Sequence, residues 1–260
     1  MRDNDKMTYP KDLTGKVALI VGGAGAIGTA TGRMLASAGA TIVITHMPGE
    51  EKGRAAAGVI GVLPAGRDHS AYPADVLDTA SLVALRTEIE RRYGRLDILI
   101  NTAGFTKLVP HANLDGLDDA FIDRIFQVNW RGQFAAIRTF APLLKASGDG
   151  LVVSISSIAG FTAIGSNIAY CAAKAGIDVM TKSLARALAP EVRVLAVSPG
   201  AVDTAFVPGR EADFNATMAA TTPLGRIGVV EDVAAAIAAC ATHLGYSTGH
   251  IIQVDGGRAL

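Results

Sequence analysis

The stretch V-G-G-A-G-A-I-G at residues 21–28 directly follows a short apolar run at 17–20. Glycines between a strand and a helix let the backbone approach a phosphate, which the free N–H groups at the start of the helix attract. Two spacings fit this stretch: G-x-G-x-x-G from Gly23 to Gly28, and G-x-x-x-A-x-G from Gly22 to Gly28, with alanine in the place of a middle glycine. Either spacing predicts a dinucleotide-binding turn, although a tight connection that binds nothing has the same pattern.

The composition narrows the class of protein. Of the 260 residues, 50% are hydrophobic and 18% are charged, so a large core can form. The 24 Lys and Arg balance the 24 Asp and Glu, which gives no reason to expect a nucleic-acid partner. Two cysteines, Cys171 and Cys240, and five scattered histidines support neither a disulfide framework nor a metal site. Because the chain shows neither a signal peptide nor a membrane-spanning stretch, we expect a cytoplasmic protein.

Short β-branched runs alternate with longer helical segments. Expected strands are 17–21, 41–45, 70–74, 97–101, 150–155, 192–197 and 251–254, and expected helices are 27–38, 79–93, 117–146, 168–188 and 231–241. This alternation predicts one doubly wound α/β domain, a parallel sheet of about seven strands with helices on both faces.

Three other segments fall outside this pattern. We expect residues 1–14 to be a flexible lead-in to a domain at 15–260. Residues 58–70 contain too many glycines for a helix. Residues 205–222 resemble a loop, and a loop of that length in a compact domain is often functional, so we interpret it as a candidate substrate lid.

Tyr170 and Lys174 are four residues apart in a predicted helix, so both side chains lie on one face. A nearby ammonium group favours the phenolate, and lowering the tyrosine pKa from about 10 to about 7 needs about 4 kcal/mol. Ser157 follows the predicted strand 150–155, at the edge where parallel sheets bind ligands, and its hydroxyl could hold a substrate oxygen while the tyrosine transfers a proton. Each feature alone also has a structural explanation, as a solvated helix face or a helix cap.

Taken in order, these motifs resemble the short-chain dehydrogenase/reductase family in its compact form, and the resemblance extends from Gly15 to Gly257. The family's serine and Tyr-x-x-x-Lys match Ser157, Tyr170 and Lys174, and its asparagine matches Asn129 in V-N-W-R-G. Further matches are the turn at 22–28, Asp75 with Val76, N-T-A-G at 101–104, Pro199 and Gly200 with Val202 and Thr204, and V-D-G-G at 254–257.

The resemblance implies a Rossmann-type fold and an oxidoreductase that interconverts a ketone and a secondary alcohol with NAD or NADP. It makes Tyr170 the acid/base, Lys174 the group that lowers its pKa and holds a ribose, Ser157 the holder of the substrate oxygen, and Asn129 the holder of a water that links Lys174 to solvent. The implied cofactor-binding residues are Gly22, Gly23, Ala24, Gly25, Ala26, Ile27, Gly28, His46, Met47, Asp75, Val76, Asn101, Thr102, Ala103, Gly104, Pro199, Gly200, Val202 and Thr204, together with Tyr170 and Lys174.

Some positions depart from the family pattern. Val21 replaces the usual threonine, Thr102 replaces an asparagine, and Ala26 replaces a glycine, which is tolerable where φ is negative, as in the first turn of a helix. The downstream motifs favour the spacing that starts at Gly22. His46 stands where an acidic residue would bind both ribose hydroxyls and repel a 2′-phosphate. Without a carboxylate or an arginine at that position, NADP is slightly favoured and NAD stays open.

The resemblance also suggests the substrate and the assembly. Phe105, Ile164, Asn167, Phe206 and Val207 fall near the substrate pocket, which suggests a partly apolar small carbonyl or alcohol. T-P-L-G-R-I-G at 222–228 is similar to oxoacyl-carrier-protein reductases and to bacterial sugar or polyol dehydrogenases. Family members pair through their two long helices, so a homotetramer is expected. A non-catalytic sensor of the nicotinamide cofactor and an isomerase or dehydratase are the alternative functions.

Overall fold

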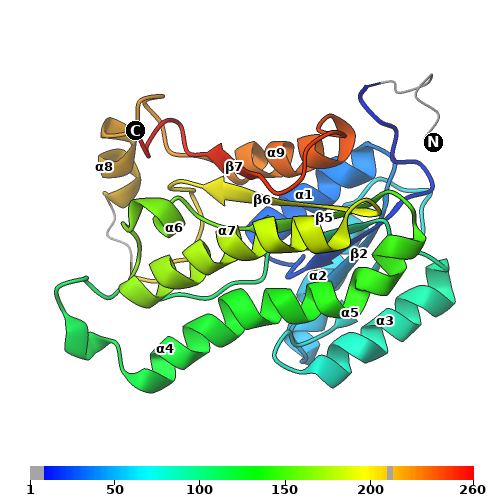
Figure 1. The fold of residues 1–260 in the computed structure, drawn as a ribbon, viewed down its shortest axis with the longest axis horizontal. Helices are drawn as coiled ribbons and strands as arrows, with labels where there is room; N and C mark the ends of the chain where they lie inside the picture. The colour runs from blue at the N-terminus through cyan, green and yellow to red at the C-terminus, as the bar shows by residue number, and fades with distance from the viewer. Residues whose placement is uncertain (1–8, 210–212) are drawn as a thin grey trace.

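A seven-stranded parallel sheet forms the centre of the computed structural model, which describes residues 9–209 and 213–260 (Figure 1). Its strands are β1 (Val17–Val21), β2 (Thr41–His46), β3 (Ser70–Pro73), β4 (Ile98–Asn101), β5 (Gly150–Ile155), β6 (Val192–Pro199) and β7 (Ile251–Val254). They follow the order β3-β2-β1-β4-β5-β6-β7, and each neighbouring pair is parallel. The strand order reverses between β1 and β4, which opens a crevice at their carboxyl ends, and the predicted fold class is confirmed.

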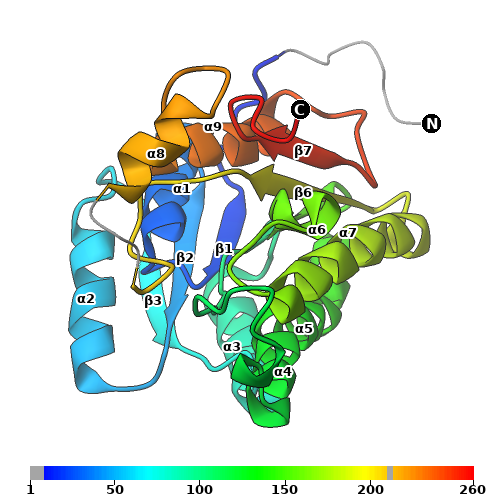
Figure 2. The same cartoon turned by 90° about the vertical axis from the view of Figure 1, so that its left-hand side faces the viewer.

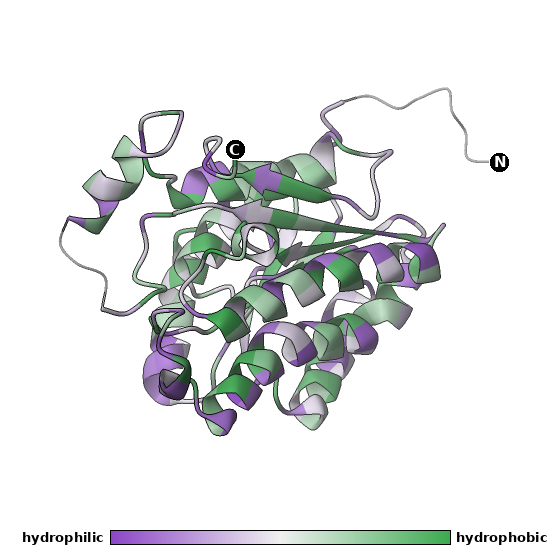
Figure 3. Cartoon of the chain, turned by 60° about the vertical axis from the view of Figure 1, so that its left-hand side comes forward, coloured by the Kyte–Doolittle hydropathy of each residue, from purple (hydrophilic) through white to green (hydrophobic). Residues whose placement is uncertain are grey.

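Helices cover both faces of this sheet (Figure 2). They are α1 (Ala26–Ser37), α2 (Glu50–Gly61), α3 (Thr79–Tyr93), α4 (Asp119–Phe126), α5 (Gly132–Ala146), α6 (Ala159–Thr162), α7 (Ile168–Leu188), α8 (Phe214–Ala220) and α9 (Val230–Thr242). Two cores result, because alternate residues of a strand point to opposite faces. Leu19 of β1 joins the core under α3, α5 and α7, whereas Ile20 joins the core under α1 and α9. The strand β1, which is buried on both faces, is therefore apolar throughout, and the central strands are mainly hydrophobic (Figure 3).

The helix expected over 117–146 is divided into three parts. It begins at Asp119, because the Asp118 carboxylate accepts a hydrogen bond from the Phe121 N–H at 2.7 Å and caps it. A π-helical segment, Gln127–Arg131, then separates α4 from α5. Such wide turns are rare and recur at functional sites, and this one carries Asn129.

Helix α2 corrects the prediction for the segment that follows β2. The sequence predicts no helix at 50–61 and contains too many glycines at 58–70 to indicate one, yet α2 continues through Gly58 to Gly61. A Cβ at either glycine would meet nothing within 4 Å, so both lie on the solvent side, where glycine costs about 1 kcal/mol of helix propensity. Two glutamates in its first turn offset this cost by favourable interaction with the helix dipole.

The two segments expected to be irregular are partly ordered. Residues 9–14 pack on the domain: Leu13 is buried, the Lys11 N–H donates to the Thr242 carbonyl at 2.8 Å, and the Lys11 ammonium pairs with Asp149 at 3.1 Å. The domain therefore begins before residue 15, and residues 1–8 lie outside the described chain. Within 205–222 the short helix α8 replaces the expected loop, and residues 210–212 are not described. No helix in the described part of the chain is long and apolar enough to cross a membrane.

Candidate active site

A cavity of about 1170 Å³ extends along the carboxyl ends of the central strands. The predicted residues that line it are Gly22, Gly25, Ala26, Ile27, Gly28, His46, Met47, Asp75, Val76, Thr102, Ala103, Gly104, Ser157, Tyr170, Lys174, Pro199, Gly200, Val202 and Thr204. Gly23, Ala24, Asn101 and Asn129 lie outside this lining. Segments far apart in the sequence thus converge because every strand of a parallel sheet ends at the same edge.

The glycine turn at the head of α1 fits a phosphate group. Gly22 has a φ of +79°, and a Cβ there would lie 2.8 Å from the Ala103 nitrogen, so only glycine suits this position. A Cβ at Gly28 would lie 2.7 Å from the Gly22 oxygen, whereas one at Gly25 would approach nothing closer than 3.3 Å. Ala26 is the first residue of α1. A Cβ at Gly23 would lie 2.5 Å from the Ile44 Cβ, so this glycine is constrained as well. The turn thus needs glycine at 22, 23 and 28 but not at 25, which favours the spacing from Gly22 to Gly28, and the bare backbone and helix start leave room for an anion.

Two threonine hydroxyls hold this turn in place. Thr45 Oγ1 accepts a hydrogen bond from the Gly22 N–H at 2.9 Å, and Thr102 Oγ1 donates to the Val21 carbonyl at 2.8 Å. These contacts supply hydrogen bonds next to Val21, where the family usually has a threonine. The role of Thr45 was not predicted from the sequence, because it depends on the pairing of β1 with β2.

At the far end of the cavity, His46 is the last residue of β2, and Asp75 follows β3. The His46 Nδ1 lies 2.8 Å from the Met47 carbonyl oxygen and donates to it when it carries the proton. The Asp75 carboxylate accepts a hydrogen bond from the Leu77 N–H at 2.8 Å. Both side chains are oriented by neighbouring backbone, at the positions where the family resemblance places the adenosine half of a dinucleotide.

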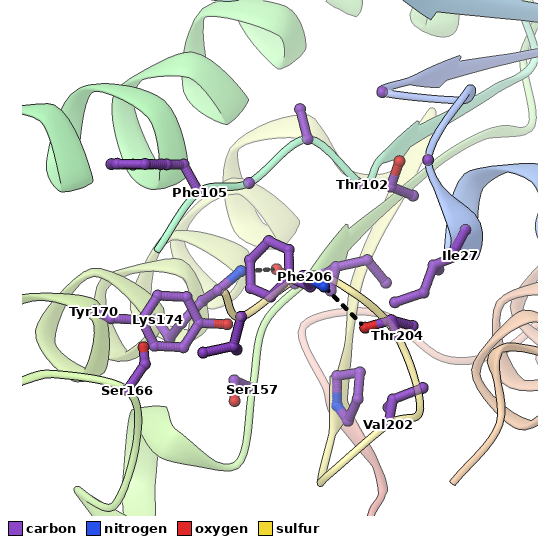
Figure 4. Close-up of a pocket in the computed structure, with 18 of the residues that line it drawn as sticks. Ile27, Thr102, Phe105, Ser157, Ser166, Tyr170, Lys174, Val202, Thr204 and Phe206 are labelled. Atoms are coloured by element: carbon purple, nitrogen blue, oxygen red, sulfur yellow. Dashed lines mark hydrogen bonds between the residues drawn. The ribbon is translucent and has the colours of Figure 1, made fainter. Parts of the chain in front are cut away.

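Ser157, Tyr170 and Lys174 face one another across the other end of the cavity (Figure 4). Ser157 follows β5, and the two other side chains come from the first turns of α7, which the Asn167 carboxamide caps by accepting from the Tyr170 N–H at 2.7 Å. The Lys174 ammonium donates to the Ile155 carbonyl at 2.8 Å. It also lies 5.4 Å from the centroid of the Tyr170 ring, close enough to stabilise a phenolate.

The Lys174 side chain is only 2% exposed, so its charge is stripped of water. This burial lowers the pKa of Lys174 from its usual value near 10.5 to about 7, and the nearby Asp178 carboxylate opposes the shift. Such a lysine exchanges a proton near neutral pH, which is typical of groups at active sites.

The Asn129 side chain holds the loop that follows β4. Its amide oxygen accepts from the Phe105 N–H at 3.2 Å, and its amide nitrogen donates to the carbonyls of Phe105 at 2.8 Å and Ile125 at 3.0 Å. The residue is fully buried. Both amide protons are therefore donated to backbone carbonyls, whereas the amide oxygen, which has two lone pairs, accepts one of these hydrogen bonds.

Apolar side chains surround the cavity near Tyr170. The Phe206 ring centroid lies 6.2 Å from that of Tyr170, and Phe105, Ile164 and Val207 also line the wall, as the resemblance suggested. Asn167 does not reach the cavity, because its amide donates to Thr106 Oγ1 at 3.1 Å and to the Lys107 carbonyl at 2.9 Å. Lining residues that the sequence did not reveal include Leu108, Ser166, Phe214 and Met218, although the last two have the i, i+4 spacing of a helix face.

Trp130 and Cys171 lie outside the cavity lining. The Trp130 ring stacks on Phe134 with centroids 5.9 Å apart, and a Cβ at Gly176 would lie 2.9 Å from it, so Trp130 fills the contact between two helices. Cys171 is buried, and burial raises the pKa of its thiol. Both therefore have packing roles.

A doubly wound sheet with a glycine turn, and a serine, tyrosine and lysine converging at its carboxyl edge, defines a nicotinamide-dependent oxidoreductase. A family profile described as "Enoyl-(Acyl carrier protein) reductase" matches residues 22–259. Together with the relatives below, this shows that the chain belongs to the short-chain dehydrogenase/reductase family. It is an enzyme of the NAD(P)-dependent class that interconverts ketones and secondary alcohols.

Similar proteins cover almost the whole chain. Cis-4-hydroxycyclohexanecarboxylate dehydrogenase of Sinomonas cyclohexanicum is 38% identical, with 93% of this chain and 96% of that protein aligned. The 3-oxoacyl-(acyl-carrier-protein) reductase FabG of Thermotoga maritima is 33% identical, over 94% and 98%. Among solved structures, a blue fluorescent protein from a metagenomic library in complex with NADPH has a TM-score of 0.85 at 30% identity, with coverage of 96% and 100%.

Proposed function

We propose that Tyr170 is the acid/base of a ketone reductase or alcohol dehydrogenase, with Ser157 and Lys174 as its partners. The observation that carries this proposal is the convergence of the three side chains on one cavity end, with the lysine ammonium 5.4 Å from the tyrosine ring. A nicotinamide cofactor bound along the Gly22–Gly28 turn would supply or accept the hydride.

During reduction, the hydroxyl groups of Ser157 and Tyr170 hold the substrate carbonyl oxygen. As negative charge develops on this oxygen, Tyr170 transfers its phenolic proton to it, and the Ser157 hydrogen bond stabilises the charge. The Lys174 ammonium stabilises the phenolate that remains. Alcohol oxidation runs the same steps backwards, with the Tyr170 phenolate as the base. Asn129 contributes by holding the loop at Phe105, which forms part of the substrate wall.

We propose NADP as the preferred cofactor. The last residue of β2 is His46 rather than a carboxylate, so the side chain at this position does not repel a 2′-phosphate, and a protonated imidazole would attract it. The complex of a similar protein with NADPH supports the same preference. Calorimetric titration with NADP⁺ and NAD⁺ tests it, since a lower Kd for NAD⁺ contradicts the proposal.

For the substrate, we propose a compact secondary alcohol or ketone with a largely apolar body. The rings of Phe105 and Phe206 and the side chains of Ile164 and Val207 supply apolar walls beside Tyr170. The names of the similar enzymes point to hydroxycyclohexanecarboxylates and 3-oxoacyl thioesters as the first compounds to try.

A panel of alcohols and ketones tests the reaction class and the substrate together. It contains cis- and trans-4-hydroxycyclohexanecarboxylate, acetoacetyl thioesters, sugars and polyols, each with both cofactors. Turnover that Tyr170→Phe abolishes while cofactor binding persists supports the proposal. A complete lack of turnover by the wild type, with the cofactor bound, favours a sensor, and a product isomerised or dehydrated without net change of the cofactor favours the other alternative.

We further propose a cytoplasmic homotetramer that pairs through the long helices. Exposed apolar side chains on α4 and α7, among them Phe126, Ile168 and Val179, suit a subunit contact. Light scattering should give a mass about four times 26.8 kDa, and a monomer would contradict the proposal.

A further inference from the structure

Helix α7 forms hydrogen bonds with Ile155, the last residue of β5, and with Ser156, the residue before Ser157. The first contact is the hydrogen bond from the Lys174 ammonium to the Ile155 carbonyl at 2.8 Å. The second involves the buried hydroxyl of Ser156, whose oxygen lies 2.5 Å from Asp178 Oδ1 and 3.3 Å from the Lys174 carbonyl oxygen. Since a hydroxyl has a single proton, the shorter contact to the Asp178 carboxylate is the main hydrogen bond.

The backbone is in close contact at the same place. Gly160, which follows β5, would carry a Cβ 2.9 Å from the Ala175 nitrogen and 2.9 Å from the Lys174 carbonyl carbon, so this segment lies directly on α7. From α5, which covers the same face of the sheet as α7, the Gln133 amide lies 3.5 Å from the Ile155 carbonyl oxygen. The end of β5 is thus held by two helices, and Ser157 follows it two residues later.

Asp178 also sets the electrostatic surroundings of Lys174. The two residues are one helical turn apart, and Lys182 follows one turn later, so a carboxylate stands between two ammonium groups along α7. The charged groups that act on Asp178 are these two lysines, β5 contributes the Ser156 hydroxyl, and α6 (A-G-F-T) has no ionisable side chain. Near Lys174, β5 and α5 contribute the Ile155 carbonyl and the neutral Gln133 amide.

We propose that Ser156 and Asp178 are positioning residues of this enzyme. Their hydrogen bond keeps Ser157, at the end of β5, in register with Tyr170 and Lys174 on α7, and the Asp178 carboxylate supports the positive charge of the buried Lys174. This inference rests on the roles proposed above for Ser157, Tyr170 and Lys174, and it adds two residues that hold these groups in position.

The charge is tested first by Asp178→Asn, which keeps an oxygen acceptor for Ser156 and removes the negative charge. Loss of a nearby negative charge makes proton loss from an ammonium easier, so the titration midpoint of Lys174 should fall by about 0.5–1 pH unit. Selective ¹³Cε-lysine labelling with NMR follows this midpoint without any substrate, and Lys174→Met assigns the signal. Glu191→Gln is the matched control, because it removes the same charge at the exposed start of β6, at the opposite edge of the sheet.

The register is tested by Ser156→Ala, which keeps the Asp178 charge. We expect a loss of kcat of about tenfold with a Lys174 midpoint close to that of the wild type. In Asp178→Asn, the pH profile of kcat/KM should move to lower pH together with the NMR midpoint, in both reaction directions. Thermal unfolding of each variant shows that it is folded under the assay conditions.

The outcomes separate the two proposals. A wild type that turns over nothing in the panel contradicts the proposed function, while the NMR midpoints still test the role of Asp178. In an active enzyme, Asp178→Asn with an unchanged midpoint overturns the electrostatic role, and Ser156→Ala with wild-type kcat overturns the positioning role. A lower melting temperature with neither effect assigns both residues to stability alone and overturns the inference.

Discussion

The Lys174 ammonium nitrogen lies 5.4 Å from the centroid of the Tyr170 ring while it donates to the Ile155 carbonyl at 2.8 Å. One buried cation is thus anchored to β5 and directed at the tyrosine of α7. This arrangement joins α7, which carries Tyr170 and Lys174, to the end of β5, which Ser157 follows.

Tyr170→Phe removes the phenolic hydroxyl and keeps the ring against Phe206. Because no other side chain replaces the proton donor, kcat should fall at least about 100-fold. Steady-state kinetics measure this fall, and calorimetry should show a cofactor Kd within about twofold of the wild type. A variant that keeps most of its turnover would remove Tyr170 from the chemistry.

Lys174→Met should flatten the dependence of stability on pH. In the cofactor-free protein the Lys174 pKa is lowered to about 7, whereas an unfolded lysine titrates near pH 10.4. Between these values the unfolded chain binds the extra proton, so the free energy of unfolding of the wild type rises as the pH increases from about 7 to about 10. Methionine abolishes that rise.

Denaturant unfolding across this pH range measures the difference. Lys145→Met, at an exposed position on α5, serves as the control and should follow the wild type. Parallel curves for Lys174→Met and the wild type would show that the buried lysine does not titrate differently in the two states.

Ala26→Gly and Gly22→Ala should have opposite consequences for cofactor binding. Ala26 begins α1, so removing its methyl group changes no backbone requirement, and the Kd should stay nearly unchanged. Gly22→Ala imposes a left-handed φ on alanine, at a cost of about 1–2 kcal/mol, and drives its Cβ into the Ala103 backbone. Calorimetry should show at least tenfold weaker binding. Equal Kd values for the two variants would argue against phosphate binding at this turn.

His46→Asp should shift the cofactor preference toward NAD. A carboxylate at the end of β2 would accept hydrogen bonds from both ribose hydroxyls and repel a 2′-phosphate. The ratio of kcat/KM for NAD⁺ to that for NADP⁺ should rise about tenfold or more, which corresponds to about 1.4 kcal/mol. His111→Asp, an exposed histidine outside the cavity lining, is the control. An unchanged ratio in His46→Asp would place the ribose elsewhere.

Asn129→Leu should destabilise the fold and loosen the substrate wall. The change leaves the Phe105 N–H and carbonyl without their side-chain partner in a buried place, at a cost of about 1–3 kcal/mol. Denaturant unfolding measures this loss, and a raised KM would report the displacement of Phe105. Full stability with reduced kcat would instead support a direct part in proton transfer.

Much of the site was predictable because its residues follow motifs at strand ends. The family shares the spacing of Ser157, Tyr170 and Lys174. One turn of helix brings Tyr170 and Lys174 to the same face, so their proximity can be predicted without the tertiary structure. The glycine spacing could be chosen from the sequence only through these downstream motifs. The structure gives a physical reason for that choice, because Gly22 has a positive φ, whereas a Cβ at Gly25 would meet nothing closer than 3.3 Å.

Other features depend on distant partners. The helix over 50–61 was not predicted because its sequence is rich in glycine. These glycines face solvent, where the helix tolerates them, and the sequence alone does not show which glycines are exposed. The π-helical turn at Asn129 has no local pattern, since the Phe105 backbone from another segment satisfies its amide. The family resemblance places Asn167 near the substrate pocket, yet its side chain caps α7.

By itself the sequence determined the parallel sheet, the family and the three side chains that we propose to react, because the sheet follows from periodicity and the others follow from motifs at fixed spacings along the chain. Only the tertiary structure decided which polar groups form hydrogen bonds next to these side chains and hold them in position. The Ser156 hydroxyl meets the Asp178 carboxylate, and Lys174 meets the Ile155 carbonyl, because packing of α7 on β5 places residues about twenty positions apart within hydrogen-bond distance. The burial that lowers the Lys174 pKa arises from the same packing.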